Sequence, residues 1–279
     1  MVFRKKSTVA LLVAWLAFSS ALCAQQPKTP TLDEILTRLD ANLNNFDTRL
    51  PSIFCDEHVL SSEVQPGMRD LNTVTDSVFL LKRTPNPDHT VSFVESRENQ
   101  HVDGKPATAQ PINAPATLSG AFEGGLALVS RSQAACMSYS LQRSNKDRPG
   151  EPYIVRFATV LTPQNSAECL LQENSKGRVF IDPASFEITH VELTTPHHVI
   201  IPGNRFAAPI TGRRVLSVDY LPVVLGGETF SMPSTITMHE VSGSGTFHMM
   251  VWSYKATYRN YHLLEVTSRI LPGDEAPAP

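Results

Sequence analysis

A period of two in hydrophobicity, the pattern of β-strands, is the feature of this chain that most restricts its fold. It is clearest in residues 177–195, where two alternating segments flank a tight turn at 182–185. The predicted apolar face of this pair consists of Val179, Ile181, Phe186 and Ile188. The sequence therefore predicts a β-hairpin at 177–195 that forms one part of a long antiparallel sheet.

The same alternation recurs along most of the chain. Further strands are predicted at residues 52–63, 72–83, 89–97, 136–143, 153–161, 168–172, 213–225, 230–241, 246–258 and 263–271. Turn-forming residues separate several of them, at Pro66-Gly67, Asp103-Gly104, Gly226-Gly227 and 242–245. Short strands at regular spacing predict a meander that curls into a barrel or half-barrel.

Two segments depart from the strand pattern and predict helices. Residues 32–49 follow the 3.6-residue period, and Thr31 with Glu34 forms a capping box at their start. A second helix is expected at 116–130, where three glycines either let it lie close to the sheet or make it a mobile lid. The predicted fold class is mainly β (α+β), a curved antiparallel sheet or half-barrel with one long N-terminal helix and a second covering helix.

The amino-terminal residues predict export. Arg4, Lys5 and Lys6 precede an uncharged apolar run that ends in a cleavage site after Ala24. The run is shorter than the roughly 20 apolar residues of a membrane span, so no stable span is expected after cleavage. The predicted organisation is a signal peptide at 1–24, a single β-rich domain at 25–272 and a disordered tail at 273–279, in a periplasmic or secreted protein.

Charge argues against nucleic acid as a partner. Cleavage after residue 24 leaves 21 Lys and Arg residues against 27 Asp and Glu residues, a net charge of −6. Proteins that bind nucleic acid usually carry clustered Lys and Arg, and here the basic clusters of the mature chain are pairs such as Arg213-Arg214.

Three cysteines remain after removal of the signal peptide, so one disulfide would leave one thiol over. Cys136 and Cys169 each lie beside a strand-like run, with the strand 153–161 between them, and are the favoured pair. Cys55 follows the apolar pair Ile53-Phe54 and is expected to be a buried, inert thiol, with pairing to another cysteine as the alternative.

The sequence contains none of the motifs expected of common enzyme classes. It lacks G-x-S-x-G, G-x-x-x-x-G-K-[ST] and G-x-G-x-x-G, and no Cys/His spacing suits a metal. No catalytic, cofactor-binding or metal-binding residue is therefore predicted. The roles of two groups of ionisable residues stay open. The histidines are either surface residues or ligands, and the carboxylates are either solvated or turn-capping residues or a glycosidase-like pair. The two groups are His190, His197 and His198, and the strand-associated carboxylates Asp76, Asp182, Asp219 and Glu265.

Several strands are apolar on both faces, as in 248–252, where Met250 and Trp252 alternate with Met249 and Val251. A sheet that is covered by helices and curved around a cavity would need that pattern, and methionine suits flexible acyl chains. The alternative is an ordinary packed core or sandwich. A cavity would be lined by Phe79, Leu81, Phe93, Val179, Ile181, Ile188, Met250 and Trp252, and an error of one residue in register would invert these faces.

The order of elements resembles a known family. A signal peptide, an amphipathic helix, a long meander with an inserted helix and a G-x-V-x-I-D-P hairpin at 177–183 are similar to the periplasmic lipoprotein carriers of the LolA/LolB type. The segment 254–261, expected before a final strand, also resembles exported relatives of that family. The resemblance implies an incomplete β-barrel whose concave face is covered by helices and holds acyl chains, and it carries over no catalytic residue. Additional loops near 105–115 and 197–212 depart from the pattern.

Three functions follow as hypotheses. The first is an exported non-enzymatic protein that binds a lipid, an acyl chain or another apolar ligand in a half-barrel cavity, without a cofactor. The second is an envelope scaffold with a solid core, whose loops or strand edges bind another envelope protein. The third is a hydrolase with an unrecognised carboxylate or histidine pair.

Overall fold

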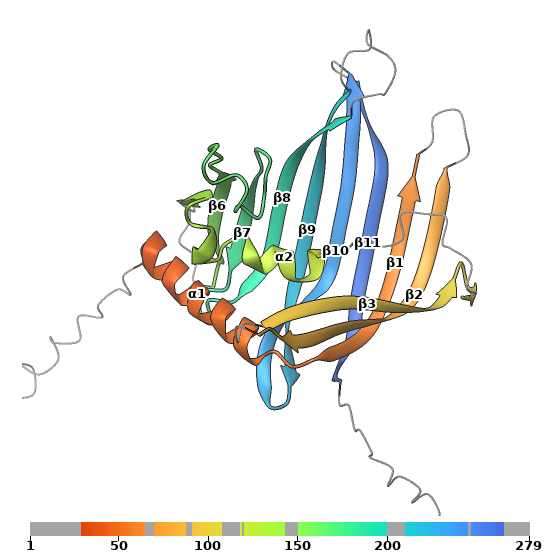
Figure 1. Ribbon diagram of the computed structural model, residues 1–279, viewed down its shortest axis with the longest axis horizontal. Helices are drawn as coiled ribbons and strands as arrows, with labels where there is room; N and C mark the ends of the chain where they lie inside the picture. The colour runs from red at the N-terminus through yellow and green to blue at the C-terminus, as the bar shows by residue number, and fades with distance from the viewer. Residues whose placement is uncertain are drawn as a thin grey trace, which may run out of the picture. The chain divides into compact units, whose positions relative to one another are not determined.

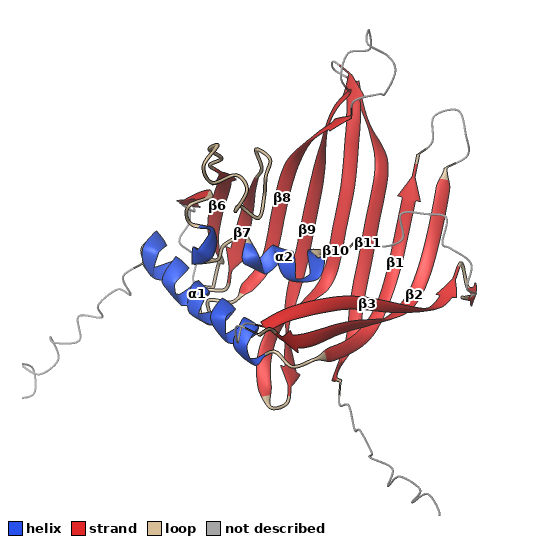
Figure 2. Cartoon of the chain, viewed as in Figure 1, coloured by secondary structure: helices blue, strands red, loops and turns tan. Residues whose placement is uncertain are grey.

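Eleven strands form one antiparallel sheet in the order β4-β3-β2-β1-β11-β10-β9-β8-β7-β6-β5 (Figure 2). This computed structural model describes residues 29–64, 70–87, 91–107, 118, 120–142, 150–199, 210–244 and 247–264. The chain divides into the units 1–31 and 32–279, and the sheet belongs to the second. The predicted signal peptide at 1–24 and tail at 273–279 lie outside the described residues.

The strands agree with the predicted meander over most of its length. Their bounds are β1 Ile53–Glu63, β2 Leu71–Pro85, β3 Val91–Val102, β4 Lys105–Pro106, β5 Met137–Gln142, β6 Tyr153–Thr159, β7 Lys176–Ile181, β8 Ile188–Val199, β9 Ile210–Leu225, β10 Glu228–Ser244 and β11 Phe247–Leu263. Neighbours in sequence are neighbours in the sheet, except that β1 pairs with β11 and β4 and β5 form the two edges. The sheet is therefore open, and it is not a closed barrel.

Three predicted features of the strands are wrong. Residues 168–172 form no strand, residues 242–244 continue β10 instead of turning, and β11 runs without a break from Phe247 to Leu263. The segment 254–261 therefore lies within β11, and residues 265–271 of the predicted final strand lie outside the described residues. The 177–195 hairpin is confirmed, but Phe186 lies in its turn, with φ of 59°, and β8 begins at Ile188.

The two helices differ in how well the sequence predicted them. Helix α1, Leu32–Arg49, has the predicted bounds and buries Ile35, Leu39, Leu43 and Phe46. Helix α2 covers only Ala121–Ala127 and not 116–130. Gly120 before it is left-handed, and Ser130 after it is extended, where it caps the short 3₁₀ helix Arg131–Gln133. Because neither backbone conformation continues an α-helix, α2 is confined to two turns.

Both helices cover the same face of the sheet, which we call the inner face (Figure 1). A row of aligned residues crosses this face from β1 to β6, one on each strand. It consists of Val59, Ala256, Ile236, Val218, Val191, Val179 and Val155, all at most 1% exposed. β-branched side chains pack well on a pleated surface, so this row forms the floor of the core.

The aromatic ring of Phe46 in α1 shows that the sheet is curved. Its centroid lies 6.3 Å from that of Phe93 in β3 and 6.3 Å from that of Phe230 in β10. Four strand spacings separate β3 from β10, about 19 Å in a flat sheet at about 4.8 Å each. One side chain reaches both strands only because the β2–β3 end bends towards the helices, as Figure 1 shows. The curved antiparallel sheet is thus confirmed.

The predicted disulfide and the predicted burial of Cys55 are confirmed. Cys136 and Cys169 form a disulfide with their Cα atoms 5.6 Å apart. Cys55 in β1 is a buried thiol outside that bond, and burial raises its pKa.

Candidate ligand-binding face

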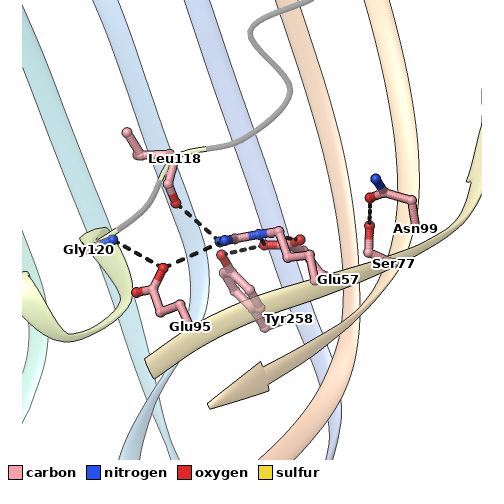
Figure 3. A network of polar contacts seen from close by, with 8 residues as sticks. Glu57, Ser77, Glu95, Asn99, Leu118, Gly120 and Tyr258 are labelled. Carbon is pink, nitrogen blue, oxygen red and sulfur yellow. Dashed lines mark hydrogen bonds and ion pairs between the residues drawn. The ribbon is translucent and has the colours of Figure 1, made fainter. Parts of the chain in front are cut away.

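A cluster of ionisable side chains interrupts the apolar inner face beside α2 (Figure 3). Glu57 of β1 accepts hydrogen bonds from Arg97 Nε of β3, at 3.0 and 2.9 Å from its two oxygens. Tyr258 Oη of β11 donates to the same carboxylate at 2.9 Å. The side chains of Glu57 and Arg97 are only 1% and 9% exposed. We call Glu57, Glu95, Arg97 and Tyr258 the polar cluster.

Strand register brings the polar cluster together. Glu57 is aligned with Tyr258 across the β1–β11 pair, and Arg97 is aligned with Phe79 across the β2–β3 pair. Arg97 lies over the Phe79 ring with its Cζ 4.8 Å from the centroid. Such stacking suits a planar guanidinium in a partly apolar setting.

The polar cluster also fixes the start of α2. Arg97 Nη2 donates to the Leu118 carbonyl oxygen at 3.1 Å, and the backbone N–H of Gly120 donates to Glu95 Oε2 at 3.1 Å. Phe122 stacks on Phe79 with a centroid separation of 4.6 Å. Helix α2 is therefore attached to the sheet by both polar and aromatic contacts.

Packing is closest at Gly125 in α2. A Cβ atom there would lie too close to the Tyr220 hydroxyl of β9, whereas Gly124 has nothing within 4 Å of its Cβ position. Gly125 thus lets the helix lie close to the sheet, which is the first of the two roles expected for the glycines of this helix.

Burial governs the electrostatics of the polar cluster. Desolvation raises the pKa of Glu57, although the positive charge of Arg97 and the hydrogen bonds from Tyr258 and Arg97 oppose the rise. Desolvation likewise raises the pKa of Tyr254, the inner-face neighbour on β11, to about 12. Glu57 and Glu95 both contact the guanidinium of Arg97, so the negative charge of each carboxylate depends on Arg97 for compensation.

Strands β8–β11 continue past α2 (Figure 1), and a row of apolar residues lies on the inner face there. Leu193, Leu216, Met238 and Tyr254 are aligned across these four strands, and Trp252 lies next to Tyr254 on the same face. The Trp252 and Tyr254 rings stack at 6.2 Å. Leu216, Met238 and Trp252 are only partly buried. We call these five residues the Trp252 strip.

Polar groups border the Trp252 strip. Arg214 Nε donates to Glu240 Oε2 at 3.0 Å across the strand pair next to Trp252. Trp252 Nε1 and Ser61 Oγ are buried and have no hydrogen-bond partner among the described residues. The strip thus combines apolar surface with buried polar atoms that have no partner among the described residues.

The residues predicted to line a cavity fall into three groups. Five are at most 1% exposed within the packed core, namely Phe79, Leu81, Val179, Ile181 and Ile188. Phe93 and Trp252 are partly buried, Phe93 against α1 and Trp252 on the strip.

Met250 is placed differently from the prediction. It is 51% exposed, and a β-bulge aligns it with Val241, whereas Trp252 is aligned with Glu240. Because β10 alternates regularly between its two faces, Met250 lies on the opposite face from Trp252.

No residue of the polar cluster was predicted from the sequence as a site residue. Glu57 lies between Cys55 and Val59 in the inward positions of β1, and Arg97 shares the face of Phe93 in β3. The sequence did contain a signal for this cluster, because Glu57 is a charged residue at an inward position of a strand whose neighbouring inward residues are apolar.

The described ionisable residues that were singled out lie neither in the polar cluster nor on the Trp252 strip. Asp76 contacts His58 at 2.7 Å and Asp219 contacts His190 at 2.6 Å, on strands β2 and β9. Asp182 accepts hydrogen bonds within its own turn. Glu265 and the side chains of His197 and His198 lie outside the described residues. In the part of the chain that the structure describes, no group of His, Cys, Asp and Glu could hold a metal ion.

Among the described helices, none is long and apolar enough to span a membrane.

No protein-family model matches the sequence, and no curated protein matches it. The chain is similar to a LolA superfamily protein. That protein is NE2245 from Nitrosomonas europaea, whose crystal structure aligns with 85% of this chain and 96% of its own, at 12% identity and a TM-score of 0.35. This is the superfamily that the order of elements resembles. At such a TM-score the likeness is distant, and the function proposed below rests on the geometry of this chain.

Proposed function

We propose that this protein is exported and that it is a non-enzymatic carrier or binding protein for a lipid or other apolar ligand. The ligand lies on the inner face, along the Trp252 strip and against α2. The observation that carries this proposal is that β8–β11 continue past α2 (Figure 1), and that their inward residues Leu216, Met238 and Trp252 are apolar and only partly buried. Partly exposed apolar surface of this kind is the usual setting of an apolar ligand.

The polar atoms beside the strip specify the ligand further. Trp252 Nε1 is a donor only and Ser61 Oγ can donate or accept, so both suit a carbonyl oxygen. An acyl ester or amide would place its chain on the strip. Its carbonyl group would reach these donors after a rotation of the side chains that bury them. A purely hydrocarbon ligand would leave both atoms unpaired.

Trp252 itself provides the assay. The sequence has two tryptophans, and Trp15 lies in the predicted signal peptide, so Trp252 is the single tryptophan of residues 25–279. A fatty acid brominated along its chain should quench the emission of Trp252 in a saturable way. Native mass spectrometry of protein purified without detergent should show an added mass that organic solvent removes.

Two substitutions separate the strip from the rest of the surface. Met238→Glu places a charge within the strip and should weaken binding by more than about tenfold, because an unpaired charge is costly in an apolar site. Leu60→Glu is the control, since Leu60 is 45% exposed and points to the opposite face from its buried neighbours Val59 and Ser61. Emission that no brominated lipid quenches, together with a clean apo mass, would refute the proposal and favour an interaction module with a filled interior.

A further inference from the structure

The outer face of the sheet, opposite the helices, carries a groove near the β5 edge. Its volume is about 400 Å³, and strands β5, β6, β7 and β8 all contribute to its lining. The polar side chains around it include Ser140, Arg156, Lys176, Arg178 and Thr194. Ala158 also lines it, and its small side chain leaves room between the longer ones. Gly177 allows close packing instead, because a Cβ atom there would clash with the Phe157 ring and the Glu192 carbonyl oxygen.

Strand register places like charges opposite each other in this groove. Arg156 of β6 is aligned with Arg178 of β7, and Lys176 lies two residues before Arg178 on the same face. Side chains aligned in this way have Cβ atoms about 4.5–5.5 Å apart, and like charges there destabilise a sheet. The fold therefore keeps three cations together at some cost to its stability.

Within the groove only one carboxylate offsets these charges. Glu192 accepts two hydrogen bonds from Arg178, at 2.8 and 2.5 Å. Arg156 donates from Nε to the neutral amide oxygen of Gln142 at 2.9 Å. The lining residues thus carry three positive charges and one negative charge, on a chain whose overall net charge is −3.

We propose that this groove binds a phosphoryl group, either as free phosphate or as the phosphomonoester headgroup of a lipid. A phosphomonoester carries a charge of about −1.5 to −2 at neutral pH, which matches the surplus of the groove. Guanidinium groups bind phosphate oxygens in a bidentate manner, and lysine binds them as a point charge. The hydroxyl groups of Ser140 and Thr194 supply neutral donors to the same space.

Titration calorimetry on residues 25–279 tests the proposal with inorganic phosphate and with phosphatidic acid vesicles, against phosphatidylcholine vesicles as the blank. Arg156→Gln and Lys176→Gln should each weaken binding by about tenfold, the usual effect of losing one charge-assisted contact. Lys255→Gln is the matched control, because Lys255 is exposed on β11, away from the groove, and its loss changes the net charge equally. Thermal unfolding of each variant verifies that it is folded.

The outcomes separate the two sources of phosphate. Saturable binding of inorganic phosphate, lost in the two groove variants, identifies a site for free phosphate. Binding to phosphatidic acid vesicles alone, with the same variant pattern, identifies a lipid headgroup. Equal weakening by Lys255→Gln, or no binding to either probe, would overturn the proposal. Met238→Glu should leave phosphate binding unchanged, so the groove and the Trp252 strip are tested independently.

Discussion

Replacing Arg97 with methionine tests whether the polar cluster stabilises the fold through charge compensation. Methionine keeps much of the aliphatic bulk over Phe79 but removes the guanidinium that donates to Glu57 and to the Leu118 carbonyl oxygen. The Glu57 side chain is 1% exposed, so its carboxylate would remain buried, with the Tyr258 hydroxyl as its hydrogen-bond donor among the described residues. Removal of one partner of a buried ion pair costs about 3–5 kcal/mol, so we expect a loss of that size in the free energy of unfolding.

The double variant Glu57→Gln with Arg97→Met provides the control. It removes both charges, so most of the lost stability should return, because a buried pair replaced as a whole is often close to neutral. Urea unfolding followed by circular dichroism measures the three free energies. A loss below about 1 kcal/mol for Arg97→Met, or a double variant as unstable as the single one, would refute the compensation argument.

The dependence on pH gives a second readout for the same variant. The pKa of Glu57 is already raised in the folded protein, and loss of Arg97 removes the main influence that lowers it. A carboxyl group with a raised folded pKa binds more protons in the folded than in the unfolded state. Stability should therefore fall as pH rises above the ordinary glutamate pKa, and Arg97→Met should be more stable at pH 5 than at pH 8, by a wider margin than the wild type.

Three further predictions follow from packing and from the cysteines. Gly124→Ala should stabilise the protein by up to about 1 kcal/mol through helix propensity, whereas Gly125→Ala should destabilise it by about 1–3 kcal/mol through contact with Tyr220. Thermal unfolding measures both changes, and adding Tyr220→Phe to Gly125→Ala should restore part of the lost stability. Reduction of the Cys136–Cys169 disulfide, which spans 33 residues, should lower the free energy of unfolding by about 3–4 kcal/mol, and a change below 1 kcal/mol would contradict the chain-entropy estimate. The buried Cys55 thiol, whose pKa is raised by desolvation, should react with a thiol reagent only as fast as the protein unfolds, so rapid labelling in native buffer would contradict its burial.

Local patterns in the sequence were sufficient to predict the elements whose formation depends on residues close together in the chain. The bounds of α1 follow from an apolar stripe of period 3.6, and the hairpin turns at Asp103-Gly104 and Gly226-Gly227 follow from glycines that adopt positive φ. The Cys136–Cys169 pairing also followed from the strand pattern around it. Each of these features is decided by interactions within a few residues, or by flanking segments whose pattern is clear.

Long-range pairing decided the rest. The pairing of β1 with β11 places Glu57 beside Tyr258, 201 residues apart in sequence, and curvature brings Arg97 of β3 to the same point. One β-bulge moved Met250 to the opposite face, which no period of two could indicate. The sequence by itself determined helix α1 and most of the strands, because these depend on local periodicity. Only the tertiary structure decided which inward side chains meet, because register, bulges and curvature arise from contacts between distant strands.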